Sequence, residues 1–266
     1  MPSRPLQLLP GLHRVICVLG CLLACLLLAM PLAAANRLLD TGSYTTTNWD
    51  MSDGLPHNLV HDIVQDRDGY IWASTWEGVV RFDGSAFTVF DNESTPQVPL
   101  SGVFSLVAEP EGGVTVATAN DGIFRYRNGQ WSELGMGVTR QLSIKRMLRA
   151  RDGSLWLAAG RRLLQLDRNG GLHDAGLAAD LPPLGIRHMT QVDDLLLLSA
   201  RQGAWQIRQG KASPWGRAAG FDRKAIRQIN SDHAGGWLVV ADDGVWHWHG
   251  DGTLQTLFTG TRARAG

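Results

Sequence analysis

The chain has 266 residues, of which 44% are hydrophobic, so it is long enough to bury a sizeable core and to fold as a globular protein. Lys and Arg together number 25, and Asp and Glu together also number 25. This balance leaves no basic excess to neutralise a phosphate backbone, so a nucleic acid is not expected as a partner.

The first 35 residues are predicted to be a secretory signal peptide. Basic residues precede the apolar run Val15–Met30, and the small residues Ala33 and Ala35 follow it in an A-x-A cleavage pattern. The alternative is an uncleaved membrane anchor, because a run of this length falls just short of the roughly 20 residues that span a bilayer. Either interpretation exports the rest of the chain, and we expect a periplasmic location.

All three cysteines lie inside that apolar run, at Cys17, Cys21 and Cys25. After cleavage the chain would have none, which excludes disulfides, thiolate catalysis and a Cys-ligated metal. Lipidation is not expected either, because three leucines follow Cys25 where a lipobox would end the apolar run.

The segment from Val60 to Phe90 predicts four short strands joined by tight turns. The expected strands are Val60–Gln65, Tyr70–Ser74, Val79–Phe82 and Phe87–Phe90. Four such strands in succession form one antiparallel sheet.

The same arrangement recurs every 40 to 44 residues. A glycine precedes the third strand at Gly78, Gly122, Gly203 and Gly244, whereas the third repeat has Arg162 there. The turn before the second strand repeats with Gly69 and Gly153. Four-stranded units of this size are typical of β-propeller blades, so the fold is predicted to be all-β.

A single blade cannot bury both faces of its sheet, so consecutive blades must pack face to face around an axis. The aromatic residues Trp72, Trp156 and Trp237 fall in the second strands of their repeats. We expect all three in the core between blades rather than in a binding surface.

The first repeat closely resembles the two-component-regulator propeller repeat. The resemblance rests on Gly54-Leu55-Pro56, then Asp66-Arg67-Asp68-Gly69-Tyr70-Ile71-Trp72, followed by Thr75 and Gly78. It extends over residues 44–258 but weakens after the first repeat, where Val116 and Leu197 replace the tryptophan. Members of this family look like membrane-bound sensors whose periplasmic propellers feed a histidine kinase or a GGDEF-type diguanylate cyclase.

The resemblance implies an extracytoplasmic ligand-sensing input module, with the chain divided into residues 1–35 (signal peptide), 36–54 (lead-in strand), 55–258 (five propeller repeats) and 259–266 (tail). Family rings usually have seven blades, so five repeats predict an incomplete ring and a truncated chain. No output-domain motif or second apolar stretch is present in the sequence. Membrane attachment would then come only from an uncleaved N-terminal segment or a missing C-terminal region.

The sequence predicts no metal site and no cofactor. Asp66-Arg67-Asp68-Gly69 begins like a calcium loop, but Tyr70 and Ile71 stand where an EF-hand requires an oxygen ligand and a glycine, so a hairpin turn is favoured. His247 and His249 share one strand face without an evident third ligand. Solvated histidines are the favoured interpretation of that pair.

One residue is a candidate for ligand binding. Trp76 lies in the turn between the second and third strands of the first repeat, where an aromatic ring can stack on a sugar or peptide. The ligand class stays open between a small molecule, a glycan and a protein.

No catalytic motif is present, so the chain is not expected to be an enzyme. Two alternatives remain: an exported binding or scaffold propeller, and a propeller-type polysaccharide lyase or hydrolase. Convergent His, Tyr, Arg or carboxylate side chains at the axial end of the blades would favour the enzyme.

Overall fold

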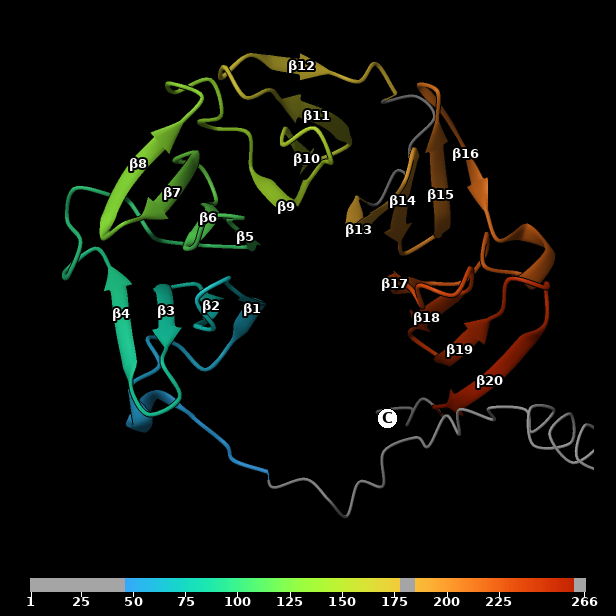
Figure 1. The fold of residues 1–266 in the computed structure, drawn as a ribbon, viewed down its shortest axis with the longest axis horizontal. Helices are drawn as coiled ribbons and strands as arrows, with labels where there is room; N and C mark the ends of the chain where they lie inside the picture. Colours follow the sequence, from blue (N-terminus) through green and yellow to red (C-terminus); the bar gives the residue numbers. More distant parts are fainter. Residues whose placement is uncertain (1–45, 178–184, 261–266) are drawn as a thin grey trace, which may run out of the picture. The chain divides into compact units, whose positions relative to one another are not determined.

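The computed structural model describes residues 46–177 and 185–260, so the predicted signal peptide and most of the tail lie outside the described residues. The chain divides into two units, Met1–Asn48 and Trp49–Gly266, and the second contains all described strands. These strands form five four-stranded antiparallel sheets, which confirms the predicted all-β propeller (Figure 1). No α-helix occurs in the described ranges.

Each blade consists of four strands that pair in chain order. The first blade contains β1 (Val60–Gln65), β2 (Ile71–Thr75), β3 (Gly78–Phe82) and β4 (Phe87–Asp91). The second contains β5 (Ser105–Ala108), β6 (Val114–Ala117), β7 (Ile123–Arg127) and β8 (Gln130–Leu134). The third contains β9 (Ile144–Arg149), β10 (Leu155–Ala159), β11 (Arg162–Leu166) and β12 (Leu172–Asp174). The fourth contains β13 (Ile186–Val192), β14 (Leu195–Ala200), β15 (Gly203–Arg208) and β16 (Lys211–Trp215), and the fifth contains β17 (Ile226–Ser231), β18 (Trp237–Ala241), β19 (Gly244–Trp248) and β20 (Leu254–Thr259).

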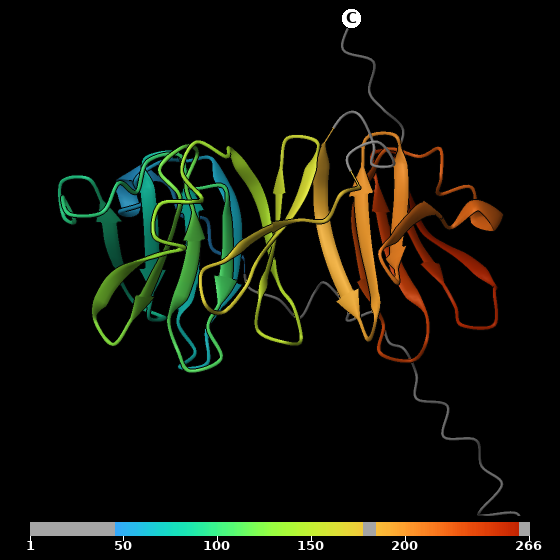
Figure 2. The same cartoon turned by 90° about the horizontal axis from the view of Figure 1, so that it is seen from above.

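The first strand of each blade is the innermost one. β1 packs beside β5, β5 beside β9, β9 beside β13, and β13 beside β17. No comparable packing joins β1 to β17 within residues 46–177 and 185–260, so the five described blades form an open ring. Seen from the side, the blades stand next to one another with their turns at two opposite ends (Figure 2).

The core consists of separate apolar clusters between neighbouring blades. Trp72 is fully buried beside Val114, Val116 and Phe124 of the second blade. Its indole Nε1 donates a 2.7 Å hydrogen bond to Asp66 Oδ2, so the one polar atom of the ring is satisfied inside the core. Trp156 packs, half-buried, against the cluster between the third and fourth blades.

Trp237 does not occupy the same place as Trp72. Trp72 is the second residue of β2 and pairs with Val64, whereas Trp237 is the first residue of β18 and pairs with Ser231. Because successive side chains of a strand alternate between faces, this one-residue offset turns Trp237 toward the fourth blade. Leu238 holds the position in the fifth blade that corresponds to Trp72.

The repeated glycine before the third strand has a steric cause. A Cβ at Gly78 would lie 2.5 Å from the carbonyl oxygen of Phe90, and one at Gly244 would lie 2.4 Å from that of Phe258. Both oxygens belong to the outermost strand. In the third blade β12 is short and its pairing with β11 ends at Leu164, so the exposed Arg162 fits without this clash.

The lead-in segment is not a strand over its described part. Residues 46–50 have no regular secondary structure, and Met51–Asp53 form a 3-10 helix (η2). A strand there would need a neighbouring strand to pair with, and no described strand pairs with this segment. Instead, the Trp49 ring packs on Phe82 and Phe87, at centroid distances of 5.2 and 6.2 Å. Over the described residues, no helix has the length and apolar character needed to cross a bilayer.

Candidate axial ligand site

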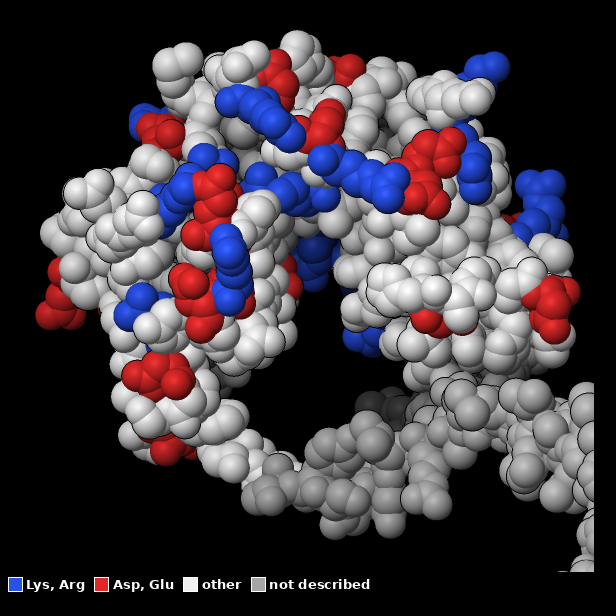
Figure 3. All heavy atoms as spheres, in the orientation of Figure 1, with Lys and Arg blue, Asp and Glu red and all other residues white. Residues whose placement is uncertain are grey.

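A cavity of about 540 Å³ lies on the axis, lined by residues from all five innermost strands. The charged and imidazole groups that line it are His61, Asp62, Arg146, Arg149, Arg187, His188 and Arg227. Figure 3 shows Lys and Arg side chains along the inner side of the ring of blades, around the central hollow. Sequence reasoning did not identify this group of residues.

A β-bulge near the start of each innermost strand carries three of these residues, His61, Arg187 and Arg227. The pairing register shifts between Val60 and Asp62, and equivalent shifts occur in β9, β13 and β17. In the second blade, Phe104 N donates to Ala117 O while Ser105 pairs with the same Ala117. The residues at the bulge are His61, Phe104, Lys145, Arg187 and Arg227. A bulge re-aims the side chain that it carries, and bulges are common beside functional sites.

Arg146 joins three blades through backbone carbonyls. Its Nε donates to Arg187 O at 2.6 Å, and its Nη1 donates to Phe104 O at 3.0 Å and to Lys145 O at 2.8 Å. No carboxylate of the described residues lies within ion-pair distance of this guanidinium. Its charge is therefore not neutralised by a direct partner.

Arg187 and Arg227 share a single carboxylate oxygen. Asp242 Oδ1 lies 3.2 Å from Arg187 Nη1 and 2.7 Å from Arg227 Nε. The Asp242 side chain is 18% exposed and Arg227 is 64% exposed. Two guanidinium groups thus converge on one acid, which leaves one positive charge in excess.

His188 is a half-buried imidazole in the same cavity. Burial, together with the nearby Arg146 guanidinium, lowers the pKa of His188 to about 4. The ring is therefore neutral at physiological pH and adds no positive charge.

Asp62 uses its carboxylate to hold the next blade. Asp62 Oδ2 accepts hydrogen bonds from Leu106 N at 2.9 Å and Ser105 Oγ at 3.2 Å, and Ser105 Oγ in turn accepts from Met147 N at 3.0 Å. These bonds link the first three blades around the axis. Asp62 is the only acid among the described residues that line the cavity, and its carboxylate is already engaged by a backbone N–H and a hydroxyl donor.

Aromatic rings lie at the same end of the blades as the bulges. Trp76 lies in the β2–β3 turn and packs edge-on against Phe104 of the second blade, with a centroid distance of 5.7 Å. Phe104 also contacts the His61 ring at 4.9 Å and lies beneath Lys145 Nζ, 3.5 Å from its centroid. The predicted ligand-binding residue Trp76, 48% exposed, thus belongs to an aromatic and cationic rim beside the axial cavity.

A second cavity of about 530 Å³ lies between the second and third blades. Its central acid, Glu109, is buried and ion-paired with Arg149. Arg125 Nε lies 3.2 Å from the same carboxylate, without the alignment of a hydrogen bond. The charges balance over the whole lining of the cleft, which has four acids (Glu109, Glu111, Glu133 and Asp167) and four arginines (Arg125, Arg127, Arg149 and Arg168). This cleft therefore has the character of an internal ion-pair network.

The aspartate turn that was considered for calcium is a hydrogen-bonded hairpin turn. Asp66 Oδ1 accepts from the backbone N–H groups of Asp68 and Tyr70, both at 3.0 Å, and Oδ2 accepts from Trp72. Donors directed at a carboxylate occupy the lone pairs that a cation would use. The described residues contain no group of three His, Cys, Asp or Glu suited to a metal ion.

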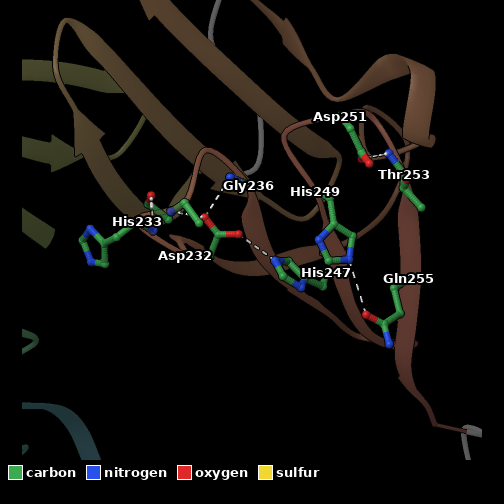
Figure 4. A network of polar contacts seen from close by, with 10 residues as sticks. Asp232, His233, Gly236, His247, His249, Asp251, Thr253 and Gln255 are labelled. Atoms are coloured by element: carbon green, nitrogen blue, oxygen red, sulfur yellow. Dashed lines mark hydrogen bonds and ion pairs between the residues drawn. The ribbon is translucent and has the colours of Figure 1, made fainter. Parts of the chain in front are cut away.

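The pair His247 and His249 is less solvated than expected. His247 Nε2 lies 2.7 Å from Asp232 Oδ2 and its side chain is 14% exposed, because it lies against the turn before β18 (Figure 4). His249 lies beside the His247 ring and 3.4 Å from Gln255 Oε1. The bond from His247, with two backbone N–H donors, lowers the pKa of Asp232 to about 2. His247 thus takes the role in the fifth blade that the Trp72 indole has in the first.

A signal for the axial residues is visible in the sequence once the bulge is known. An apolar residue, two variable residues and a second apolar residue recur at or just before the start of each innermost strand. The five stretches are Val60–Ile63, Val103–Leu106, Ile144–Met147, Ile186–Met189 and Ile226–Ile229. Two adjacent variable positions break the strict alternation of a regular strand, which is the pattern that a bulge produces.

Residues 54–77 match the family model described as two component regulator propeller, which confirms the resemblance seen in the first repeat. None of the curated proteins compared with the chain matches it.

Among solved structures, the chain is similar to the extracellular domain of BT3049 from B. thetaiotaomicron, which is described as a hybrid two component system. The TM-score is 0.63 and the identity is 18%, and the match covers 80% of this chain and 32% of that one. A second similar structure is the extracellular domain of BT4673 from the same organism, described as a one component system, with a TM-score of 0.57, 16% identity, and coverage of 76% and 30%. The chain thus spans about a third of the length of these two structures.

An enzyme also shares the fold. Virginiamycin B lyase from Staphylococcus aureus, solved as a catalytically inactive variant with quinupristin, has a TM-score of 0.60 and 13% identity, with coverage of 79% of this chain and 73% of that one. At these identities the likenesses establish the propeller fold and nothing about activity.

Proposed function

Because residues 54–77 are a two component regulator propeller repeat, we propose that this chain is the exported, ligand-sensing input module of a bacterial signalling protein. The observation that carries the proposal is the axial cavity, where side chains from all five blades converge. Cavities of this volume commonly hold a small ligand by means of a few well-placed polar groups and an apolar wall. A ligand that touches several innermost strands would change how the blades pack against one another.

The proposal requires that ligands bind in the axial cavity. A thermal-shift panel on the full chain, covering neutral sugars, amino acids, short peptides and organic anions, should find at least one class that raises the melting temperature. Gln228 lines the cavity and is exposed, so Gln228→Trp should fill the space without disturbing the core. Stabilisation that survives in Gln228→Trp would contradict an axial site.

Export is the second requirement. Material from the periplasm should begin at Asn36, because Ala33 and Ala35 fit a signal peptidase site. An intact Met1 terminus in the inner membrane would support the anchor instead. Protein found in the cytoplasm would contradict an extracytoplasmic sensor.

An exported propeller lyase or hydrolase is a second candidate, and the same cavity supports it. Histidine and arginine side chains converge at the axis, which is the arrangement expected of such an enzyme. The carboxylate of Asp62, however, is engaged by backbone donors. An enzyme would turn over a bound ligand, and this turnover would be lost in His61→Gln or His188→Gln. A sensor would return the ligand unchanged.

A further inference from the structure

The charges of the axial cavity do not balance. Arg146, Arg187 and Arg227 come from three successive blades, and Asp242 is the only acid within ion-pair distance of any of them in the described structure. Asp62 is held by the second blade, and His188 is neutral at physiological pH. The cavity therefore has an excess of positive charge that the described side chains do not compensate.

Each of these arginines keeps N–H donors that no described residue uses. Arg146 bonds through Nε and Nη1, so Nη2 stays free. Arg227 meets Asp242 through Nε, and Arg187 meets it through Nη1. A guanidinium group presents its donors as a planar fork that matches a carboxylate, and the shared Asp242 oxygen shows that two of these forks can converge on one acid.

The free donors are distributed over three strands, β9, β13 and β17, so a ligand with more than one carboxylate could engage several of them at once. The rim beside the cavity carries the aromatic rings of Trp76 and Phe104, and Phe104 contacts the cavity-lining His61. An apolar carbon skeleton can lie against such rings. The site thus combines cationic groups from three strands with an aromatic surface at its rim.

We propose that the axial cavity binds a small organic anion with two or more carboxylate groups, held by Arg146, Arg187 and Arg227, with its carbon skeleton toward Phe104 and Trp76. This inference rests on the proposed function, because it names the ligand class of the same site. It applies equally whether the bound anion is sensed or turned over.

The test is calorimetric titration of the full chain with propane-1,2,3-tricarboxylate, with its neutral triamide as the matched compound. The tricarboxylate should bind and the triamide should not. Arg227→Gln should weaken binding about tenfold, and Arg187→Gln/Arg227→Gln more, since a charge-assisted hydrogen bond contributes about that factor. Arg227→Lys keeps the charge but loses the fork, so it should fall between wild type and Arg227→Gln.

Two controls keep the result interpretable. Arg151 is 74% exposed, pairs with Asp193 and does not line the cavity, so Arg151→Gln should bind like the wild type. Arg146 also holds the backbone of neighbouring blades, so Arg146→Gln is scored only if its thermal unfolding matches that of the wild type. Arg227→Gln remains a valid test in either case, because Arg227 is exposed and Asp242 is the one described acid that it contacts.

The outcomes separate this inference from the proposed function. No binding of the tricarboxylate, or equal binding by wild type and Arg227→Gln, overturns the anion assignment. A neutral ligand that is blocked by Gln228→Trp but not by Arg227→Gln leaves the axial sensing site standing and overturns its ligand class. Equally tight binding of inorganic phosphate or sulfate would show a simple oxyanion site, and it would also overturn the assignment of an organic polycarboxylate as the ligand.

Discussion

The axial cavity and the cleft between the second and third blades are similar in volume and different in electrostatic character. The cleft between the second and third blades is lined by four acids and four arginines, among them the buried Glu109 with Arg149, so its charges are balanced internally. On the axis, Arg146 bonds only to carbonyl oxygens, and Arg187 and Arg227 share one acid. The comparison teaches that arginine content alone does not identify a ligand site. The deciding feature is whether the guanidinium donors already have partners.

The largest expected effect concerns the internally paired cleft. Glu109→Gln should lower the free energy of unfolding by about 3 kcal/mol, because it leaves two arginines without their buried counter-charge. Chemical denaturation of the full chain measures this. Asp174→Asn is the control, since its pair with Arg162 is exposed, lies outside the cleft and should cost less than about 1 kcal/mol. Similar losses for the two variants would show that the cleft is solvated rather than structural.

The next effect is a pH dependence that belongs to the axis. The folded state holds the pKa of His188 at about 4, whereas an unfolded histidine titrates near 6.5. Between these values the unfolded chain binds a proton that the folded chain does not, so stability should fall as the pH is lowered from about 6.5 to 4. We expect a loss on the order of 1–2 kcal/mol, because the ring is partly solvated.

His188→Gln should remove this part of the pH dependence and leave the part below pH 4. That lower part comes from carboxylates such as Asp232, whose pKa in the folded state is about 2. The stability that such a carboxylate contributes is fully present above the ordinary aspartate pKa and is lost as the pH falls toward 2. An unchanged slope between pH 6.5 and 4 in His188→Gln would assign the effect to another group.

Arg227→Gln should have a small effect on stability, below about 1 kcal/mol, because Arg227 is exposed and Asp242 keeps Arg187 as a partner. Its effect on anion binding should be large by comparison. A melting temperature that falls as far as that of Glu109→Gln would mean that the axial arginines, like those of the cleft, are structural.

The smallest effect on stability is expected at the rim. Trp76→Ala should change the free energy of unfolding by less than about 1 kcal/mol, because the ring is half exposed and packs on Phe104. It should nevertheless weaken binding of the tricarboxylate several-fold, measured by the same titration. If Trp76→Ala bound the tricarboxylate as tightly as the wild type, the aromatic rim would not be part of the binding site.

The sequence was sufficient to predict the propeller, the four-strand repeat and the buried role of Trp72, because these follow from periodicity and from a turn that recurs. Trp237 lies in the second strand and packs in the core between blades as expected, but its register in the strand differs by one residue from that of Trp72. Two adjacent glycines, Gly235 and Gly236, precede β18, and Gly235 rather than Gly236 holds the left-handed turn position that corresponds to Gly69. A pattern of glycine and tryptophan cannot distinguish these registers.

The axial site was not predictable in the same way. Its residues are separated by about 40 positions along the chain and converge only because the blades are arranged around an axis. Arg187 and Arg227 also lie at bulges, where the alternation of a regular strand does not apply. Trp76 was identified as a candidate from its turn, but its contact with Phe104 of the next blade required the three-dimensional arrangement.

The most direct measurement is an experimental structure of the full chain with propane-1,2,3-tricarboxylate bound. The account predicts the anion on the axis, with its carboxylates within hydrogen-bond distance of the Arg187 and Arg227 guanidinium groups. An anion found beside Glu109 in the cleft between the second and third blades, or an empty axial cavity at saturating concentration, would contradict it.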